Sequence, residues 1–465
     1  MYCKRKFSVQ SLVCRECHNP NSQTRKLCKL ANFLNFTYVI FGPHLFAIAK
    51  LSQALQMRKN KQAAIGFIFI TLLIDVIGFG IIIPVMPKLI TELTGEGLGA
   101  AAKYGGWMLF SFAIMQFLFS PILGNLSDRF GRRPILLMAL FGFTIDYLIL
   151  AYAPTLGWLF VGRILAGMLG ASFTTATAYI ADISTPEKRA QNFGLIGAAF
   201  GLGFIIGPVL GGLLGQYGSR VPFLAAAALT FLNFLYGYFI LPESLSLRNR
   251  RRFEWKRANP LGSLVQLRKF PVVYGLVGSL ICIYIAGHAI QSNWSYFTML
   301  VLDWNEKQVG YSLGFVGILI ALVQGGLIRI AIPKFGAQKA MFIGLILYTV
   351  GFLLFAFADR GWMMYAILVP YCLGGIAGPA IQGLISNQVP ANEQGELQGA
   401  LTSLISVTSI IGPPLMTNLF AYFTSSRAPI HFPGISFLTG GVLIAISIIL
   451  ARRSMGKASK SSTTS

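Results

Sequence analysis

The chain has 465 residues, of which 55% are hydrophobic and only 11% charged, and its mean hydropathy is +0.65. This composition excludes a soluble globular protein and indicates an integral membrane protein. The long apolar runs also exclude a membrane β-barrel, whose strands are only about ten residues long. The net charge of +23 would suit a nucleic-acid-binding protein, but the positions of the charges argue against one.

Apolar stretches follow one another along the chain between short polar breaks, and each is long enough to cross about 30 Å of hydrocarbon as an α-helix. The predicted spans are residues 64–87, 105–125, 134–153, 157–181, 193–216, 221–241, 272–292, 311–332, 339–357, 361–385, 397–422 and 432–451. The predicted fold class is therefore an all-α membrane protein with twelve transmembrane helices.

A long basic break divides these spans into two groups of six. We expect a basic, poorly ordered N-terminal extension, two six-helix bundles joined by a cytoplasmic linker, and a cytoplasmic tail. In chain order these segments are residues 1–56, 57–241, 242–271, 272–451 and 452–465.

Most of the positive charge lies in three segments. Residues 1–61 hold eleven lysines and arginines against one glutamate, residues 242–271 hold eight against two acids, and residues 452–465 hold four against none. These segments carry +20 of the net +23, and an even number of spans puts all three on one side, which the positive-inside rule identifies as the cytoplasm. We therefore expect a multi-pass protein of the inner (plasma) membrane with both termini in the cytoplasm.

The N-terminal extension contains the motif Cys14-Arg15-Glu16-Cys17-His18. Its spacing matches c-type haem attachment, and the cysteine pair could hold zinc. Haem is attached outside the cytoplasm, however, whereas this segment is expected inside. We therefore predict no metal and no cofactor, and we interpret Met57 as a natural start preceded by an extension of the reading frame.

The polar stretch 124–133 separates the second and third spans, and its ten residues leave no room for a folded loop. The two helices are therefore predicted to be antiparallel neighbours. The charges could simply anchor a cytoplasmic turn. Glycines let backbones approach closely, however, and an aspartate here is within reach of a neighbouring charge, so we interpret the stretch as a conformational latch. The candidate latch residues are Gly124, Asp128, Arg129, Gly131, Arg132 and Arg133.

Three pairs of short segments are separated by the same offset of 205 positions, and two of the pairs repeat the same residues. The matched motifs are Phe130-Gly131 and Phe335-Gly336, Ala181-Asp182 and Ser386-Asn387, and Ile206-Gly207-Pro208 and Ile411-Gly412-Pro413. A single offset indicates a duplicated six-helix unit with parallel halves. Such repeats are typical of transporters that bind substrate near the membrane midplane, between the halves.

The polar turn, the matched halves and the linker resemble the major facilitator superfamily. Four blocks are similar to the tetracycline-resistance-type branch of its drug and proton antiporters: residues 124–133, 178–183, 223–229 and 241–244. The resemblance covers nearly everything after Met57. It implies two pseudo-symmetric six-helix bundles that form a monomeric antiporter, which exports an amphipathic drug-like compound. The implied partners are the small-molecule substrate, protons and the lipid bilayer, and no nucleic acid. The implied energy source is the proton gradient.

Three ionisable residues fall inside predicted spans and are candidates for proton coupling. Asp75 lies about eleven residues into the first span, at a depth of about 16 Å, where the neutral acid is favoured and can exchange a proton. It could alternatively be a protonated group hydrogen-bonded to a neighbouring helix. Asp146 and Arg163 reach similar depths on adjacent helices, so an ion pair is expected. The pair could be purely structural. It could instead couple protons, as the resemblance of residues 163–171 to the family's helix 4 motif implies.

The fifth span contains a series of small residues and a proline. Small residues at this spacing permit close helix packing, and proline bends a helix. The series also resembles the antiporter signature of exporters, which favours efflux over uptake. The signature residues are Gly203, Gly207, Pro208, Gly211 and Gly212.

Polar residues inside the spans are candidates for lining a substrate cavity. They are Gln116, Gln291, Asn293, Gln324 and Gln382, with Tyr348 as an aromatic neighbour. His288 is interpreted as a hydrogen-bonded core residue rather than a proton relay. The resemblance would place a histidine and an acid at the positions of Ile320 and Tyr348, and their absence favours a substrate other than metal-bound tetracycline.

Two other functions remain open at this stage. A metabolite or sugar symporter would share the fold, and a non-transporting membrane sensor would share the helices. An enzyme is not favoured, because no Ser/His/Asp set, metal-ligand cluster or nucleotide-binding loop occurs within the spans.

For the latch, we expect Asp128 and Arg132 to reach the region of the eleventh span when the transporter faces outward.

Overall fold

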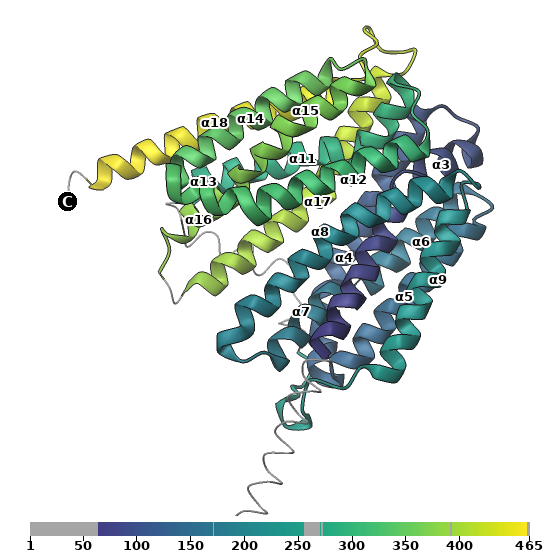
Figure 1. The fold of residues 1–465 in the computed structure, drawn as a ribbon, viewed down its shortest axis with the longest axis vertical. Coiled ribbons are helices and arrows are strands. Elements are labelled where there is room, and N and C mark those ends of the chain that lie inside the picture. The colour runs from purple at the N-terminus through teal and green to yellow at the C-terminus, as the bar shows by residue number, and fades with distance from the viewer. Residues whose placement is uncertain (1–63, 171, 255–269, 271–272, 391–392, 463–465) are drawn as a thin grey trace, which may run out of the picture. The chain divides into compact units, whose positions relative to one another are not determined.

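The computed structural model describes residues 64–170, 172–254, 270, 273–390 and 393–462 (Figure 1). The predicted extension 1–56 and much of the predicted linker 242–271 lie outside these residues. The chain divides into two compact units, Met1–Ala64 and Ile65–Ser465, and the second contains the helices described here. Its described residues form helices and turns, with no strand among them.

Twelve of these helices are long and apolar enough to cross a membrane, which confirms the predicted number. In the N-terminal half they are Ala64–Ile82, α4 (Leu98–Phe130), α5 (Arg132–Tyr152), α6 (Leu156–Leu169) with α7 (Ser172–Ile183), α8 (Pro186–Gly215) and α9 (Val221–Ile240). In the C-terminal half they are α11 (Tyr274–Val301), α12 (Glu306–Leu322) with a π-helical turn Val323–Leu327 and α13 (Ile328–Phe335), α14 (Ala337–Ala356), α15 (Gly361–Leu373) with a 3-10 turn Gly374–Ile376 and α16 (Ala377–Ser386), α17 (Gln394–Phe423) and α18 (Ile435–Ser462).

Several predicted boundaries differ from the structure; α4, α8 and α11, for example, are longer than the predicted spans 105–125, 193–216 and 272–292. The first span ends at Ile82 rather than at residue 87, and a separate helix, α3 (Met86–Thr94), follows it. Pro84 and Pro87 explain the break, because proline lacks an N–H and disfavours helical backbone at the residue before it. The last helix continues to Ser462, beyond the predicted end at residue 451.

The halves share backbone features at the offset seen in the sequence. Gly131, between α4 and α5, has φ 110° and ψ 162°, and Gly336, between α13 and α14, has φ 77° and ψ 152°. Only glycine adopts this backbone region readily. The fourth helix of each half is also interrupted, at Gly170 and at Gly374–Ile376, so each pair of features recurs about 205 positions apart.

The halves contact each other most extensively through α8 with α12 and α4 with α17 (Figure 1), and α4 also contacts α11. We call the end of the bundle at Gly131 and Gly336 the linker end and the opposite end the distal end. At the distal end a methyl group added to Gly106 of α4 would collide with Thr417 of α17, and one added to Gly212 of α8 would collide with Glu306 of α12. The halves are therefore tightly packed there.

The same helices separate towards the linker end. A methyl group added to Gly194, Gly197 or Gly201 of α8 would meet no atom within 4 Å. The same holds for Gly395 and Gly399 at the start of α17. The structure is therefore closed at its distal end and open at its linker end.

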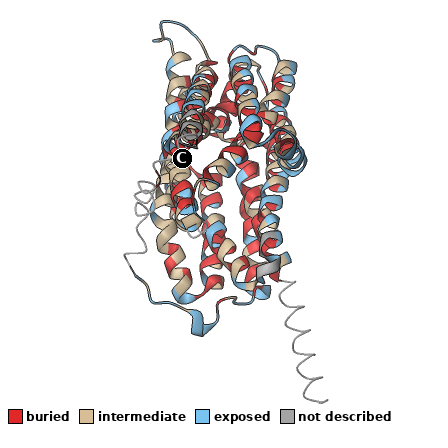
Figure 2. Ribbon diagram, turned by 90° about the vertical axis from the view of Figure 1, so that its left-hand side faces the viewer, coloured by how far each residue is buried: buried red, intermediate tan, exposed pale blue. Residues whose placement is uncertain are grey.

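Burial follows the pattern expected of a helical bundle in a bilayer. Buried residues lie between the helices, and intermediate or exposed residues cover much of their outer surfaces (Figure 2). Large apolar side chains are among the exposed ones, including Leu232 at 60%, Ile330 at 64% and Phe239 at 77% exposure. Exposed apolar surface of this extent suits lipid rather than water, and the chain is a multi-pass membrane protein.

Packing along α8 can be tested with two glycines of that helix. Gly211 lies against the carbonyl oxygen of Ile81, so Gly211→Val should force the first helix away from α8 and lower the thermal unfolding temperature of the purified protein in detergent. The expected loss is about 2 kcal/mol, typical of overpacking. Gly197→Ala is the matched control: its added methyl group has open space, and alanine favours a helix by about 1 kcal/mol. Equal unfolding temperatures for the two variants would contradict the close contact.

Candidate functional site

One ion pair lies deep within the N-terminal half. Asp146 of α5 and Arg163 of α6 are in contact, with 0% and 5% exposure respectively, as their predicted depths suggested. Gly162 makes room for the pair, because a side chain there would lie 2.8 Å from Asp146 Oδ1. Removing one partner of such a pair would leave a buried charge uncompensated. The pair thus joins α5 to α6, and its part in proton coupling remains a prediction.

Asp75 is in a different environment from Asp146. Both of its carboxylate oxygens are buried and have no hydrogen-bond partner among the described residues. The hydroxyl of Ser172, at the start of α7, approaches it. A fully ionised carboxylate without a partner is costly in such a place, so the site accommodates the neutral acid. Asp75 is therefore an acid with buried carboxyl oxygens, and no cation among the described residues balances its charge.

The predicted latch forms a compact network at the linker end. The Arg132 guanidinium contacts Asp128 at 2.6 Å and Asp182 of α7 at 3.0 Å, and it also donates a hydrogen bond to the Ser127 hydroxyl. Glu243, just after α9, accepts a hydrogen bond from the backbone N–H of Arg132 at 2.8 Å. A carboxylate at the start of a helix is stabilised by unpaired N–H groups and by the helix dipole.

Other latch candidates have distinct surroundings. Arg129 lies 5.0 Å from the ring of Phe130, and Arg133 donates a hydrogen bond to the Tyr238 carbonyl oxygen. Gly131 leaves the space that the Glu243 carboxylate occupies, whereas Gly124 has no neighbour within 4 Å of an added methyl group.

The partners of Arg132 join α4, α5, α7 and the segment after α9, all within the N-terminal half. The expected contact of Asp128 with the eleventh span, now α17, refers to another conformation and stays a prediction. Asp182 and Glu243 are not among the latch residues predicted from the sequence, which places Asp182 in a repeated segment and Glu243 in a block that resembles the family. Both are acids at the same membrane edge as the three arginines of the stretch 124–133, and this was the available signal in the sequence.

The predicted antiporter signature forms a seam with two sides. Gly203, Gly207 and Gly211 face the first helix, where added methyl groups would collide with Val76, Ile77 and Ile81. On the other side, Gly212 lies against Glu306, and the Pro208 carbonyl oxygen lies 2.5 Å from the methyl position of Gly310. Because α8 thus packs closely on the helix that carries Asp75 and on α12 of the other half, a shift of α8 affects both contacts.

A cavity of about 380 Å³ lies among the helices of the C-terminal half, and we call it the C-terminal cavity. Three predicted residues line it: Gln291 of α11, Gln324 of the π-helical turn and Tyr348 of α14. His288 and Ile320 line it as well. His288 is buried, as predicted for a core position, and it also lines this cavity.

The other cavity candidates lie elsewhere. Gln382 is not a lining residue, but it donates a hydrogen bond at 3.1 Å to the hydroxyl of Tyr284, which is one, and so helps to position that side chain. Gln116 donates a hydrogen bond to the Gly170 carbonyl oxygen at the break in the fourth helix. Asn293 is fully buried, is not among the lining residues, and has no hydrogen-bond partner among the described residues.

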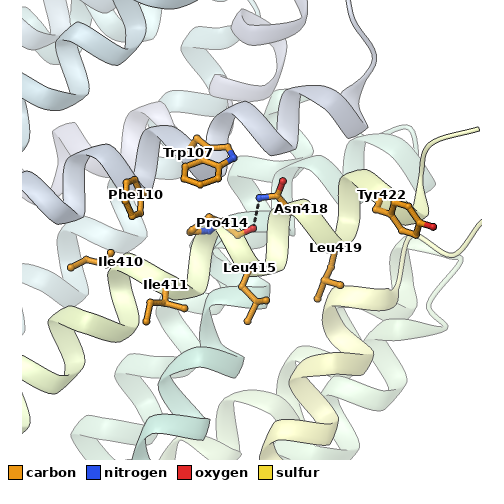
Figure 3. A pocket seen from close by; sticks show the side chains of 9 residues that line it. All are labelled: Trp107, Phe110, Ile410, Ile411, Pro414, Leu415, Asn418, Leu419 and Tyr422. Carbon is orange, nitrogen blue, oxygen red and sulfur yellow. Dashed lines mark hydrogen bonds between the residues drawn. The ribbon is translucent and has the colours of Figure 1, made fainter. Parts of the chain in front are cut away.

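A larger hollow of about 520 Å³ lies along the distal halves of α4 and α17 (Figure 3). Its lining is aromatic and aliphatic, with Trp107 and Leu415 as examples, and its one amide, Asn418, is already bonded to the Pro414 carbonyl oxygen at 2.7 Å. Because the halves are closed at this end, the groove opens outward towards lipid. It lacks the polar groups that would orient a ligand, so the C-terminal cavity is the better candidate for substrate.

An ion pair connects the halves at the distal end. Lys88 of α3 lies 2.8 Å from Glu306, the first residue of α12, and Glu306 is 7% exposed. The hydrogen bond with Glu306 raises the pKa of Lys88 above its ordinary value of 10.5. Sequence reasoning missed this pair, which we call the distal clamp, because two charges at span ends carry no sign that they meet.

No group of three or more metal-ligating side chains occurs among the described residues. The site thus comprises a buried unpaired acid, a glycine seam, two charged networks at opposite ends and a polar cavity. Together with two six-helix halves that are packed at one end and open at the other, it defines a helical membrane transporter.

The chain belongs to the Major Facilitator Superfamily, whose family model matches residues 68–334 and 328–464. It is 40% identical over 383 residues to the tetracycline resistance protein, class C, of Escherichia coli, covering 82% of this chain and 95% of that protein. It is 36% identical over 397 residues to the class E protein of Escherichia coli, covering 85% and 95%. The crystal structure of the human organic anion transporter MFSD10 shares the fold, with a TM-score of 0.61 and 23% identity over 84% of this chain and 99% of that one.

The distal clamp can be measured with a double-mutant cycle of Lys88→Met and Glu306→Gln. The coupling energy in thermal unfolding should be about 1 kcal/mol, as for partly exposed pairs. Because the pKa of Lys88 is raised on folding, the coupling should be present below the ordinary lysine pKa of about 10.5 and be lost as pH rises through the higher folded value. Additive effects at about pH 8, where the lysine is charged in both states, would show that the pair is not coupled.

The latch can be tested through transport rate. Asp128→Asn removes one of two acids around Arg132 and should slow exchange about fivefold, the equivalent of about 1 kcal/mol for a half-exposed pair, while substrate affinity stays unchanged. Asp359→Asn, in an exposed distal loop, is the matched control. Lost substrate binding with a normal rate at saturation would contradict the latch role.

Proposed function

We propose that this transporter exports an amphipathic, drug-like compound in exchange for protons, using the proton gradient and no cofactor. Relatives at 36–40% identity that are named tetracycline resistance proteins support export of a drug-like compound. The glycine seam of α8 fits the exporter signature. Under this proposal the protein works as a monomer in the inner membrane.

The observation that carries the proposal is the carboxyl group of Asp75, whose two oxygens have no hydrogen-bond partner in the part of the chain that the structure describes. A group that no cation balances is stable when it holds a proton and becomes costly when it releases one, unless its surroundings change. Asp75 lies on the helix that packs against the α8 seam, and α8 also packs on α12 of the other half. Gain or loss of this proton therefore favours different arrangements of the two halves.

Asp146 and Arg163 have a supporting role in this proposal. Their mutual contact balances both charges, so neither needs to exchange a proton for the structure to be stable. The pair holds α5 against α6 within the N-terminal half. We therefore assign proton exchange to Asp75 and positioning to the pair.

Charge distribution supports an inward-facing assignment. The described helix ends beside the basic segments 1–61, 242–271 and 452–465 lie at the linker end, and under the positive-inside rule such basic segments face the cytoplasm. The open linker end then admits substrate from the cytoplasm, while the packed distal end and the distal clamp separate the cavity from the outside. After reorientation the proton would bind from outside, and its release inside would reset the cycle.

The proposal is tested with everted membrane vesicles. A pH-sensitive dye reports an imposed proton gradient, and an exported compound should dissipate it. Asp75→Asn should reduce this dissipation at least about tenfold, the change expected when a single proton-transfer group is lost, and should leave substrate binding intact. Asp75→Glu should keep part of the activity, because it keeps an exchangeable proton.

Two comparisons separate the roles of the acids. Asp146→Asn leaves Arg163 unpaired and should lower stability by about 3–5 kcal/mol, so its main effect should be reduced folded protein. Asp359→Asn should change neither quantity. The proposal fails if no amphipathic compound dissipates the gradient, or if Asp75→Asn exchanges normally; proton-driven uptake of a sugar would favour a symporter instead.

A further inference from the structure

The lining of the C-terminal cavity is polar and aromatic but nearly free of charge. Its volume of about 380 Å³ lies in the range of small-molecule sites. The described residues of the lining include three tyrosines, two glutamines, one histidine and one serine, and there is no aspartate, glutamate, lysine or arginine among them. The cavity therefore offers many hydrogen bonds and flat apolar surfaces without a carboxylate.

The aromatic surface is held in place by reciprocal glycine contacts. The rings of Tyr348 and Tyr371 lie 5.1 Å apart. A methyl group added to Gly374 would lie 2.7 Å from Tyr348 Cγ, and one added to Gly351 would lie 2.9 Å from Tyr371 Cβ. Each tyrosine thus fills the space left by a glycine near the other. Rings fixed in this way present a preformed surface to a flat ligand.

The polar groups are also positioned. Gln382 donates its hydrogen bond to the Tyr284 oxygen, which leaves the hydroxyl hydrogen of Tyr284 to be donated to a ligand. The His288 ring packs against Gly412 of α17, where no side chain would fit. Gln324 reaches the cavity from the π-helical turn Val323–Leu327, and such turns within α-helices are frequent at functional sites.

A charged ligand would find no matching group among the described residues of this lining. Moving a charge from water into a cavity without an opposite charge is unfavourable, and a metal ion carried by the ligand would lack the carboxylates that divalent cations prefer. Asp75 does not supply one, because it is outside the lining and both its oxygens are buried. We propose that the C-terminal cavity selects an uncharged, planar aromatic compound with hydroxyl or carbonyl groups, taken up without a metal ion.

This inference rests on the proposed function, since it names the substrate class of the proposed exporter. Binding is measured by quenching of tryptophan fluorescence with the full chain in lipid nanodiscs, with empty nanodiscs to correct for partition into lipid. Three probes are compared: an uncharged polyhydroxylated flavone, a planar quaternary ammonium dye, and tetracycline with Mg²⁺. The flavone should bind at least about tenfold more tightly than either of the others.

Two nearly isosteric variants place a carboxylate in the cavity. Gln324→Glu and Gln291→Glu should each weaken flavone binding about tenfold and strengthen binding of the dye and of the tetracycline chelate. Gln216→Glu, the same change at the distal end of α8 and outside the cavity, is the control and should alter none of the affinities. Since glutamine and glutamate have nearly the same size, loss of folding is not expected to obscure the comparison.

The outcomes separate this inference from the proposed function. Tighter binding of the dye or the chelate to the unmodified protein, or a flavone affinity that both glutamate variants leave unchanged, overturns the assigned substrate class. If only the tetracycline chelate dissipates the vesicle proton gradient, the assigned substrate class is also overturned, but proton-coupled export is supported. Selective flavone binding together with no gradient dissipation by any probe supports the cavity assignment and overturns proton-coupled export.

Discussion

Close backbone contact along α8 is the constraint on which this structure depends. Glycines on one side of the helix admit the first helix of the same half, and Gly212 with the Pro208 carbonyl oxygen admits α12 of the other half. Larger residues would push both neighbours away. Since lipid gives no hydrophobic driving force between helices, such close packing is what holds them together. The seam therefore links the buried acid on the first helix to the interface between the halves.

The distribution of charge follows from the same apolar surroundings. Within the N-terminal half, Asp146 has a cation beside it, whereas Asp75 has none among the described residues. Networks of charged side chains occur instead at the two membrane edges, around Arg132 at the linker end and between Lys88 and Glu306 at the distal end. Of these two networks, the distal clamp is the one that connects the halves, and it does so at the closed end. The arrangement suits a transporter that exchanges edge contacts as it reorients.

Much of the architecture could be predicted because each spanning helix must be apolar and must form its backbone hydrogen bonds within itself. Span number, the duplicated unit and the turn at Gly131 all follow from local composition, and Asp146 and Arg163 were paired from depth alone. Breaks inside helices were harder: the interruptions at Gly170 and Gly374–Ile376 lie in runs whose composition is that of continuous apolar helix. Asn293 and Gln291 look alike as polar residues of one helix, yet only Gln291 faces the cavity.

Sequence alone was sufficient for the fold class, the family and the polar residues worth considering, because hydropathy, charge bias and motif spacing are properties of single segments. It could not establish which side chains meet. Glu243 reaching the start of α5, Lys88 reaching α12, and three tyrosines and His288 converging on one polar cavity all depend on the relative rotation and tilt of helices. Those quantities are set by contacts between residues far apart in the chain, and they become visible only when the helices are packed together.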